Sequence, residues 1–187
     1  HNNIRFNKKE LLEQAFIHRS YINENPRSGL EHNERLEFLG DAVLELVVTE
    51  HLYTVYPHHN EGDLTSYRSA LVNAVTLGSV ADELSFNDML KLSKGEAKDI
   101  SRARSSILAD AYEAFIGALY LDQGYTSVKE FITKTLLIKT DEIIKQGLYK
   151  DAKSFVQEKS QELYGITPAY RVLHEEGPDH DKIFRSE

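Results

Sequence analysis

The sequence contains no cysteine and only four prolines and one methionine among its 187 residues. Without cysteine the chain can form neither a disulfide nor a thiolate metal site, and it has no cysteine nucleophile. Basic residues are also few, because 22 Lys and Arg stand against 30 Asp and Glu and leave a formal net charge of −8. The sequence has no long apolar run and no basic-apolar leader, so neither a membrane span nor a signal peptide is predicted. We therefore expect a cytoplasmic protein without disulfides.

The acidic balance bears on possible partners. Double-stranded nucleic acid is normally met by a basic surface, since counterion release supplies much of the affinity. Taken alone, the net charge argues against an RNA partner. A metal cluster, however, needs surplus carboxylates that bound cations neutralise, so the charge does not exclude that partner. The hydrophobic share of 41% is enough for a core of ordinary size and a second small module.

Three carboxylates share one face of a predicted amphipathic helix over residues 33–56. Glu34, Glu37 and Asp41 are spaced three and four residues apart, which places them on one side of a helix over roughly 10 Å. Like charges at this spacing repel, and Arg35 is the one cation close by. A divalent cation would turn this repulsion into binding.

A second acidic helix is predicted over residues 106–124. Asp110 and Glu113 form a pair three residues apart inside a run built otherwise of Ile, Leu, Ala, Phe and Tyr. Carboxylates in so apolar a helix are costly to desolvate unless they are paired or bound to metal. If the two helices meet, Glu37 and Asp41 join this pair in an all-oxygen cluster of the kind that Mg²⁺ or Mn²⁺ prefers. A solvated helix face is the competing interpretation, and the spacing alone leaves the two about even.

The string Asn-Glu-Arg-Leu-Glu-Phe-Leu-Gly-Asp at residues 33–41 resembles the hallmark of ribonuclease III, a family of double-stranded-RNA endonucleases. Segments similar to others of that family occur in the same order at residues 15–20, 61–65 and 107–117. From about Asp151 the chain looks like the start of the family's double-stranded-RNA-binding domain. The resemblance implies an all-α endonuclease domain of the ribonuclease III type, followed by a truncated α+β module that binds double-stranded RNA.

The expected boundaries are residues 1–146 for the endonuclease domain and 151–187 for the partial RNA-binding domain, whose C-terminal part we expect to be absent. The pattern within the second segment predicts a helix over 152–163 and two strands over 170–175 and 183–185.

The resemblance also implies the chemistry. Phosphodiesters of double-stranded RNA, including rRNA and mRNA precursors, would be hydrolysed by Mg²⁺-activated water, leaving 5′-phosphate and 3′-hydroxyl ends. Mn²⁺ would substitute for Mg²⁺. Asp41 and Glu113 would be the most directly catalytic residues, and Glu34 and Glu61 would support them. The implied metal ligands are Glu37, Asp41, Asp110 and Glu113.

The resemblance also implies which residues contact a partner subunit or RNA: Phe38 and three polar residues. In ribonuclease III the phenylalanine matching Phe38 inserts into a pocket on a twin subunit, so we expect a homodimer, which gives one cut per strand. Gln157 and Gln161 could reach 2′-hydroxyls across a shallow minor groove, and His180 lies in a loop expected to enter that groove. A solvated helix face is nearly as good an interpretation of the two glutamines.

Local patterns add predictions about helix starts. Asn7 to Glu10 is a capping box opening a helix in which His18 is a hydrogen-bonded structural residue and not a ligand. Asp63 is expected to cap a helix whose apolar stripe continues to Leu77. The second acidic helix should end at Gly124.

Two other functions stay open from the sequence. One is a catalytically silent ribonuclease-III-like RNA-binding protein, although such relatives generally lose acidic ligands that this chain retains. The other is a helical metal-dependent phosphohydrolase acting on nucleotides, which would not explain the second module.

Overall fold

The computed structural model describes residues 4–98, 102–145, 147, 157, 160–169, 171–176 and 183–186. The chain divides into two units, His1–Tyr149 and Lys150–Glu187. The described part of the first unit is built of helices and has no strands. The α-helices are α1 (Lys9–Ala15), α2 (Arg19–Glu24), α3 (Glu34–Val55), α4 (Glu61–Val72), α5 (Ala74–Glu83), α6 (Arg102–Thr135) and α7 (Thr140–Lys145). Short 3-10 helices lie at Phe86–Asp88, Glu96–Lys98 and Leu137–Lys139. The predicted all-α domain is confirmed. In the described part of the chain, no helix combines the length and apolar content needed to cross a bilayer.

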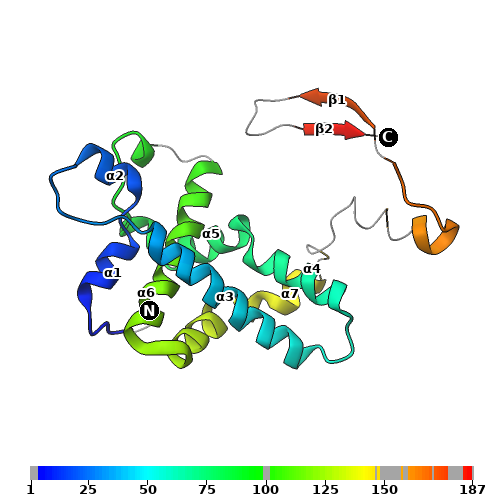
Figure 1. Ribbon diagram of the computed structural model, residues 1–187, viewed down its shortest axis with the longest axis horizontal. Helices are drawn as coiled ribbons and strands as arrows, with labels where there is room; N and C mark the ends of the chain where they lie inside the picture. Colours follow the sequence, from blue (N-terminus) through cyan, green and yellow to red (C-terminus); the bar gives the residue numbers. More distant parts are fainter. Residues whose placement is uncertain are drawn as a thin grey trace. The chain divides into compact units, whose positions relative to one another are not determined.

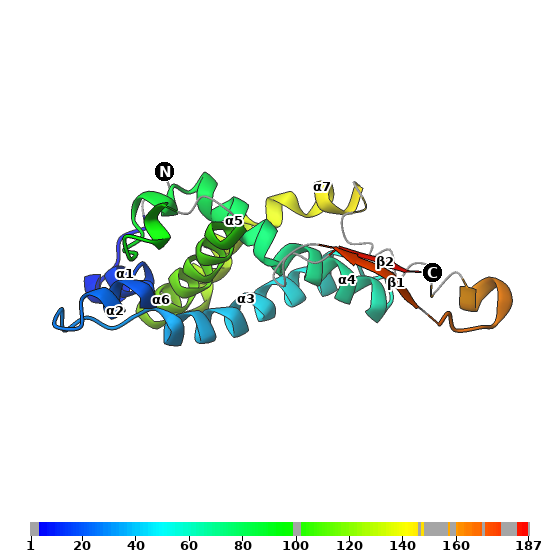
Figure 2. The ribbon, with the colours of Figure 1, turned by 90° about the horizontal axis from the view of Figure 1, so that it is seen from above.

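The central feature of the first unit is the crossing of α3 and α6, which Figure 1 shows in blue to cyan and in green. Figure 2 shows the same pair from above. A Cβ atom on Gly40 of α3 would lie 1.8 Å from the backbone oxygen of Glu113, and one on Gly117 of α6 would lie 2.1 Å from that of Leu36. Because neither position has room for a side chain, the two backbones approach more closely than ordinary residues would allow.

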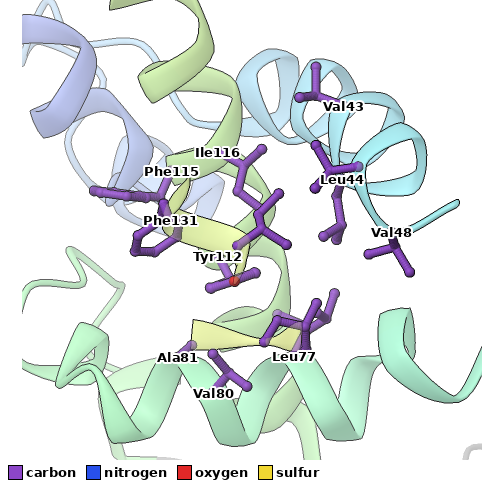
Figure 3. Close-up of a cluster of buried hydrophobic side chains, with 14 of the residues drawn as sticks. Val43, Leu44, Val48, Leu77, Val80, Ala81, Tyr112, Phe115, Ile116 and Phe131 are labelled. Atoms are coloured by element: carbon purple, nitrogen blue, oxygen red, sulfur yellow. The ribbon is translucent and has the colours of Figure 1, made fainter. Parts of the chain in front are cut away.

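The core lies around this crossing and extends to α5. In Figure 3, Tyr112 and Ile116 of α6 lie between Leu44 of α3 and Leu77 of α5. The Tyr112 hydroxyl is fully buried and lies 2.8 Å from the Thr135 hydroxyl, so its hydrogen-bonding capacity is satisfied inside the core. The core thus stabilises the α3–α6 pair on the side away from solvent.

The predicted break at Gly124 is confirmed. Gly124 has φ 78° and ψ −176°, a conformation that interrupts α6 between two helical stretches. The second stretch turns Phe131 back onto Phe115, with ring centroids 4.9 Å apart. The glycine therefore allows α6 to fold over its own apolar face.

The predicted capping box at Asn7 to Glu10 is wrong. Helix α1 begins at Lys9, and its N-cap residue Lys8 makes no side-chain capping hydrogen bond. The carboxylate of Asp122 instead accepts the backbone N–H groups of Asn7 and Lys8, both at 2.9 Å. A carboxylate distant in sequence thus satisfies the free donors that local capping was expected to satisfy.

The single helix predicted from Asp63 to Leu77 is also wrong. Asn60 is the N-cap of α4 and forms a capping box with Asp63, so the helix starts earlier than expected. Asn73 then interrupts the stripe, because its extended backbone ends α4 and its side chain accepts from the Thr76 N–H to cap α5.

The second unit contains a short helical stretch and a β-hairpin. Gln157 and residues 160–164 are helical. Strands β1 (Val172–Glu176) and β2 (Ile183–Ser186) pair antiparallel, with Glu176 opposite Ile183. His180 lies outside the described residues.

Candidate metal centre

The start of α3 is fixed by Asn33. This residue is 2% exposed, and its side-chain amide donates to the Ala15 carbonyl at 3.2 Å while its backbone N–H donates to the Ile17 carbonyl at 2.9 Å. Its own carbonyl accepts the N–H groups of Leu36 and Glu37. The first turn of α3 is therefore anchored to the C-terminal end of α1 and the residues just after it, and this anchor helps to set the direction of the Glu37 side chain.

Three of the four predicted metal ligands converge where α3 crosses α6. One oxygen from each of Glu37, Asp110 and Glu113 lies within 4.8 Å of the other two. Asp110 and Glu113 are one turn apart on α6, while Glu37 comes from the turn of α3 that precedes Gly40. The glycine contact between the helices thus brings carboxylates from two distant parts of the sequence to one place.

Burial and mutual repulsion favour the protonated forms of these groups. Burial raises the pKa of Glu37 to about 7, and the charge of Asp110 adds to the rise. Burial raises the pKa of Glu113 to about 8, and the charges of Asp41 and Asp110 act in the same direction. Burial also raises the pKa of Asp110. The three carboxylates therefore form a site whose negative charge is poorly compensated by the protein.

No described Lys, Arg or His forms an ion pair with Glu37, Asp110 or Glu113. The nearby cation Arg19 is paired with Glu34 at 3.1 Å. All the converging donors are oxygens, and they are half-buried and lack a protein counterion. This donor set fits a hard divalent cation such as Mg²⁺ or Mn²⁺ better than a soft metal. The chain thus has an acidic cluster suited to metal binding.

Asp41 lies next to the trio but not within it. Its side chain is exposed one turn after Glu37 on α3, and its charge raises the pKa of both Glu37 and Glu113. Its predicted place in the ligand set stays a prediction. Glu34 is also exposed, and its charge raises the pKa of Glu37 and Asp110. It is close enough to influence the cluster electrostatically.

Glu61 is not brought to the cluster within one chain. It is the first residue of α4, accepts a hydrogen bond from the Thr65 hydroxyl at 3.2 Å, and lines a 440 Å³ pocket with Tyr53 of α3. Tyr53 is 16 residues beyond Glu37, or about 24 Å along a helix. The predicted supporting role of Glu61 would therefore require another subunit.

Two features of the site were not anticipated. Gly40 and Gly117 set the distance between the helices, and their position inside strongly helical patterns was the available signal. Glu45, one turn beyond Asp41, adds to the charge that raises the pKa of Glu113. Because Glu45 is four residues after Asp41, it lies on the same face of the helix, and this spacing was the signal by which the sequence could have identified it.

His18 has the predicted hydrogen bonds but not the predicted surroundings. It lies between α1 and α2 as the N-cap of α2, not inside a helix. Its Nδ1 lies 2.8 Å from the Ser20 hydroxyl and 3.3 Å from the Ser20 backbone nitrogen. The helix prediction failed here because the backbone leaves α1: the Ile17 carbonyl accepts from the Asn33 N–H, and Ile17 pairs with Lys91 in an isolated parallel bridge.

Phe38 projects from the crossing into solvent. Its side chain is 81% exposed. It borders a hollow of about 610 Å³ that is lined also by Leu11, Leu39 and Leu121. A large aromatic side chain in this setting is available to another surface and contributes little to the core of its own domain.

Comparison with known proteins agrees with this geometry. The sequence profile of a family described as Ribonuclease-III-like matches residues 8–140. A Ribonuclease 3 of Streptococcus pneumoniae strain P1031 is 46% identical over 184 residues, which cover 98% of this chain and 79% of that protein. The chain belongs to the ribonuclease III family. A Ribonuclease 3 of Borreliella afzelii strain PKo is 44% identical over 97% of this chain and 74% of its own length. The resemblance carried by residues 33–41 is thus confirmed.

Solved structures of the family have the same fold. The crystal structure of the ribonuclease III nuclease domain from Campylobacter jejuni has a TM-score of 0.63 and 37% identity, covering 75% of this chain and 97% of that one. A second structure of that domain has a TM-score of 0.63 and 39% identity, covering 70% and 87% of the two chains. The description of this second structure reports structural flexibility in the region of the Campylobacter nuclease domain that is involved in dimer formation.

Proposed function

We propose that this chain is an endoribonuclease that hydrolyses phosphodiesters of double-stranded RNA with Mg²⁺ or Mn²⁺, leaving 5′-phosphate and 3′-hydroxyl ends. The observation that carries the proposal is the convergence of Glu37, Asp110 and Glu113, to which no described residue offers an ion pair, in a chain of the ribonuclease III family. Processing of rRNA and mRNA precursors is the expected biological use.

Each carboxylate has a distinct part in the proposed mechanism. Glu37, Asp110 and Glu113 would hold the ion, and their half-buried position would exclude part of the competing water. When bound, divalent ions supply activation of a water molecule and neutralise charge on the departing 3′-oxygen. Asp41 is exposed one turn after Glu37, and its charge acts on Glu113, which supports a role in contacting both the ion and the RNA. We assign the most direct catalytic roles to Asp41 and Glu113.

The proposed active form is a homodimer assembled through α3. Phe38, Leu46 and Tyr53 are 81%, 57% and 76% exposed, and with the exposed Ala42 they fall within an arc of about 80° on the helix. A two-fold axis across this stripe would place each Phe38 in the hollow of the partner subunit. The related Campylobacter domain, described as having a dimer-forming region, supports this assembly.

A dimer would also explain how Glu61 could act at the acidic cluster although it lies far from the cluster of its own chain. Since α3 separates Glu61 from the cluster of its own chain, an antiparallel partner helix would bring Glu61 of one subunit toward Glu37 of the other. We propose that Glu34 acts within its own subunit, where Arg19 holds it at 3.1 Å, and that Glu61 acts across the interface. Two such composite sites would cut the two strands of one duplex.

For the second unit we propose the opening part of a double-stranded-RNA-binding domain, over residues 151–187. Gln157 and Gln161 are both exposed on its helical stretch, four residues apart, which suits a shared approach to a minor groove. Leu163 and Tyr164 are 65% and 74% exposed. These exposed apolar side chains are available to pack against another surface. His180 keeps its predicted RNA contact as part of this proposal.

A nuclease assay tests the function directly. A labelled duplex RNA, a matched single strand and a nucleotide are each incubated with Mg²⁺ or with EDTA. We expect cutting of the duplex alone and only with Mg²⁺. Cleavage of the nucleotide alone would support a phosphohydrolase, and duplex binding without cleavage would support a silent RNA-binding relative.

The variants Asp41→Asn and Glu113→Gln should abolish cutting while preserving helicity, because both are nearly isosteric and remove only charge. Wild-type turnover in either variant would contradict the assigned roles. Loss of helicity would show instead that the carboxylate is needed for folding.

A further inference from the structure

Tyr56 ends α3 and begins the turn that leads to Glu61. Its backbone N–H still donates to the Leu52 carbonyl at 3.0 Å, but its φ of −117° and ψ of 60° are no longer helical. Pro57 follows, and a proline disfavours the helical conformation in the residue before it. Residues 57–60 then connect Tyr56 to the start of α4. The position of Glu61 therefore depends on how this turn is held.

Three rings pack together at this turn. The Tyr56 and His59 rings meet edge to face, with centroids 5.3 Å apart. The Tyr67 ring centroid lies 5.7 Å from that of Tyr56 and 5.6 Å from that of His59. Tyr67 belongs to α4 and is buried, so it offers a fixed surface to the other two rings. The His59 backbone N–H also donates to the Tyr56 carbonyl at 3.1 Å. The turn is thus packed against α4 through the Tyr56 ring.

The Tyr56 hydroxyl connects the same ring to α7, which lies beside α4 (Figure 1). It donates to Oδ1 of Asp141 at 3.1 Å. Thr140 and Ile143 on either side of Asp141 are buried, so α7 presents this carboxylate from an anchored position. Burial raises the pKa of Tyr56, and the hydrogen bond to Asp141 adds to the rise, so the phenol keeps its proton and donates at neutral pH.

The end of the turn determines where Glu61 begins α4. Oδ1 of Asn60 accepts the Asp63 N–H at 2.9 Å, and the Asp63 carboxylate accepts the Asn60 N–H at 3.4 Å. Glu61 follows Asn60, and its carboxylate accepts from the Thr65 hydroxyl at 3.2 Å. These bonds all lie within the first turn of α4 and its cap. The placement of Glu61 relative to α3 and α7 therefore comes from the turn that Tyr56 holds.

We propose that Tyr56 is a positioning residue for Glu61, and that its hydrogen bond to Asp141 holds the turn from which Glu61 would reach the acidic cluster of the partner subunit. The inference rests on the proposed function, because it assumes that Glu61 supports the cleavage of RNA. Precise placement of such a group matters, since a displacement of about 1 Å can cost about 100-fold in rate. Tyr56 acts in this proposal only through Glu61.

The variant Tyr56→Phe removes the hydroxyl and keeps the ring, so the packing on His59 and Tyr67 is preserved. Asp141→Ala removes the acceptor of the same hydrogen bond. Asp141→Asn keeps an oxygen at the Oδ1 position and serves as the conservative rescue. The matched control is Tyr120→Phe, because the Tyr120 hydroxyl on α6 makes no hydrogen bond to a described residue.

Cleavage of a labelled duplex RNA with Mg²⁺ is measured on the full chain, and kcat is separated from KM. We expect Tyr56→Phe and Asp141→Ala to lower kcat about 3- to 10-fold, the factor that one ordinary hydrogen bond represents, at an unchanged KM. Asp141→Asn and Tyr120→Phe should match the wild type. A wild-type kcat in Tyr56→Phe would overturn the proposal.

A double-mutant cycle tests whether Tyr56 acts through Glu61. Glu61→Gln alone should lower kcat, and adding Tyr56→Phe should then have no further effect. Additive losses would overturn the proposal, because they would show that the hydroxyl stabilises the domain without acting through Glu61. Wild-type kcat in Glu61→Gln would also overturn it, and would leave the metal-dependent cleavage proposed for the acidic cluster unaffected.

Hydrogen exchange without RNA tests the turn independently of cleavage. We expect the amides of residues 59–65 to exchange faster in Tyr56→Phe than in the wild type, at an unchanged melting temperature, whereas Tyr120→Phe should show no difference. A wild type that cuts no duplex would refute the proposed function. Equal exchange in Tyr56→Phe and in a wild type that cuts would refute only the role of Tyr56.

Discussion

The substitution Gly40→Ala tests how the crossing of α3 and α6 builds the site. The added Cβ would lie 1.8 Å from the backbone oxygen of Glu113, whereas ordinary contacts begin at 3.4 Å. The helices must therefore separate by roughly 1.5 Å, because a carbonyl held in α6 cannot rotate away. Overpacking of this kind costs about 1–3 kcal/mol, and the upper end applies here. Better helix propensity returns about 1 kcal/mol, leaving a net destabilisation of about 2 kcal/mol.

Urea unfolding measures this loss, with Gly95→Ala as the control. The nearest atom to a Cβ at Gly95 is 3.8 Å away, so that variant should be neutral or slightly more stable. Gly40→Ala should also melt about 4–8 °C lower and bind Mn²⁺ more weakly, since Glu37 moves away from Glu113. Unchanged stability together with unchanged metal affinity would refute the view that this contact sets the ligand distances. The double variant with Gly117→Ala should cost less than the sum, because both push apart the same helices.

Three other perturbations have defined outcomes. The pKa values of Glu37 and Glu113 are raised from 4.5 to about 7 and about 8, so the folded state holds more protons than the unfolded state between these values. Without divalent ions, the free energy of unfolding should fall as pH rises from 4.5 to 8, and urea titrations at several pH values should show that these two carboxyls oppose stability at high pH. Adding Mg²⁺ should raise the melting temperature more at pH 8 than at pH 5.5; an equal rise would argue against binding at these groups. Phe38→Ala should weaken the dimer by about 3–5 kcal/mol if its ring is fully packed there, and sedimentation at several concentrations would reveal an unaffected dimer. Replacing Mg²⁺ with Ca²⁺ should preserve duplex binding and suppress cutting, because Ca²⁺ takes more ligands at longer distances; equal cleavage rates would contradict metal-organised attack.

Helical periodicity predicted the parts of the fold that depend on local sequence. The acidic helix from Asn33 and the break at Gly124 are both set by residues within one or two turns, so they could be read directly. The start of α1 could not, because its donors are satisfied by Asp122, more than a hundred residues away. The α4–α5 boundary was missed for a different reason: Asn73 is a strong cap placed within an unbroken apolar stripe.

The candidate site likewise has features that local sequence predicts and features that only tertiary packing determines. Spacing identified the carboxylates on each helix, but only the packing shows that Glu37, Asp110 and Glu113 converge while Asp41 stays exposed beside them. The surroundings of His18 depend on separate segments around Asn33 and Lys91, so they could not be predicted from its neighbours in sequence. Motifs thus identified the ligand types, and tertiary contacts determine which of these carboxylates lie together.

The closeness that assembles the site also makes it costly for the metal-free protein. Gly40 and Gly117 bring α3 and α6 together, and this approach both desolvates the carboxylates and increases their repulsion. The pair can tolerate this because the other side of the crossing is a fully buried core around Tyr112. Protons relieve the repulsion at neutral pH, as the raised pKa values of Glu37 and Glu113 indicate. A divalent ion would relieve it more completely by displacing those protons, so the free energy lost to repulsion in the metal-free fold would be recovered as affinity for the ion.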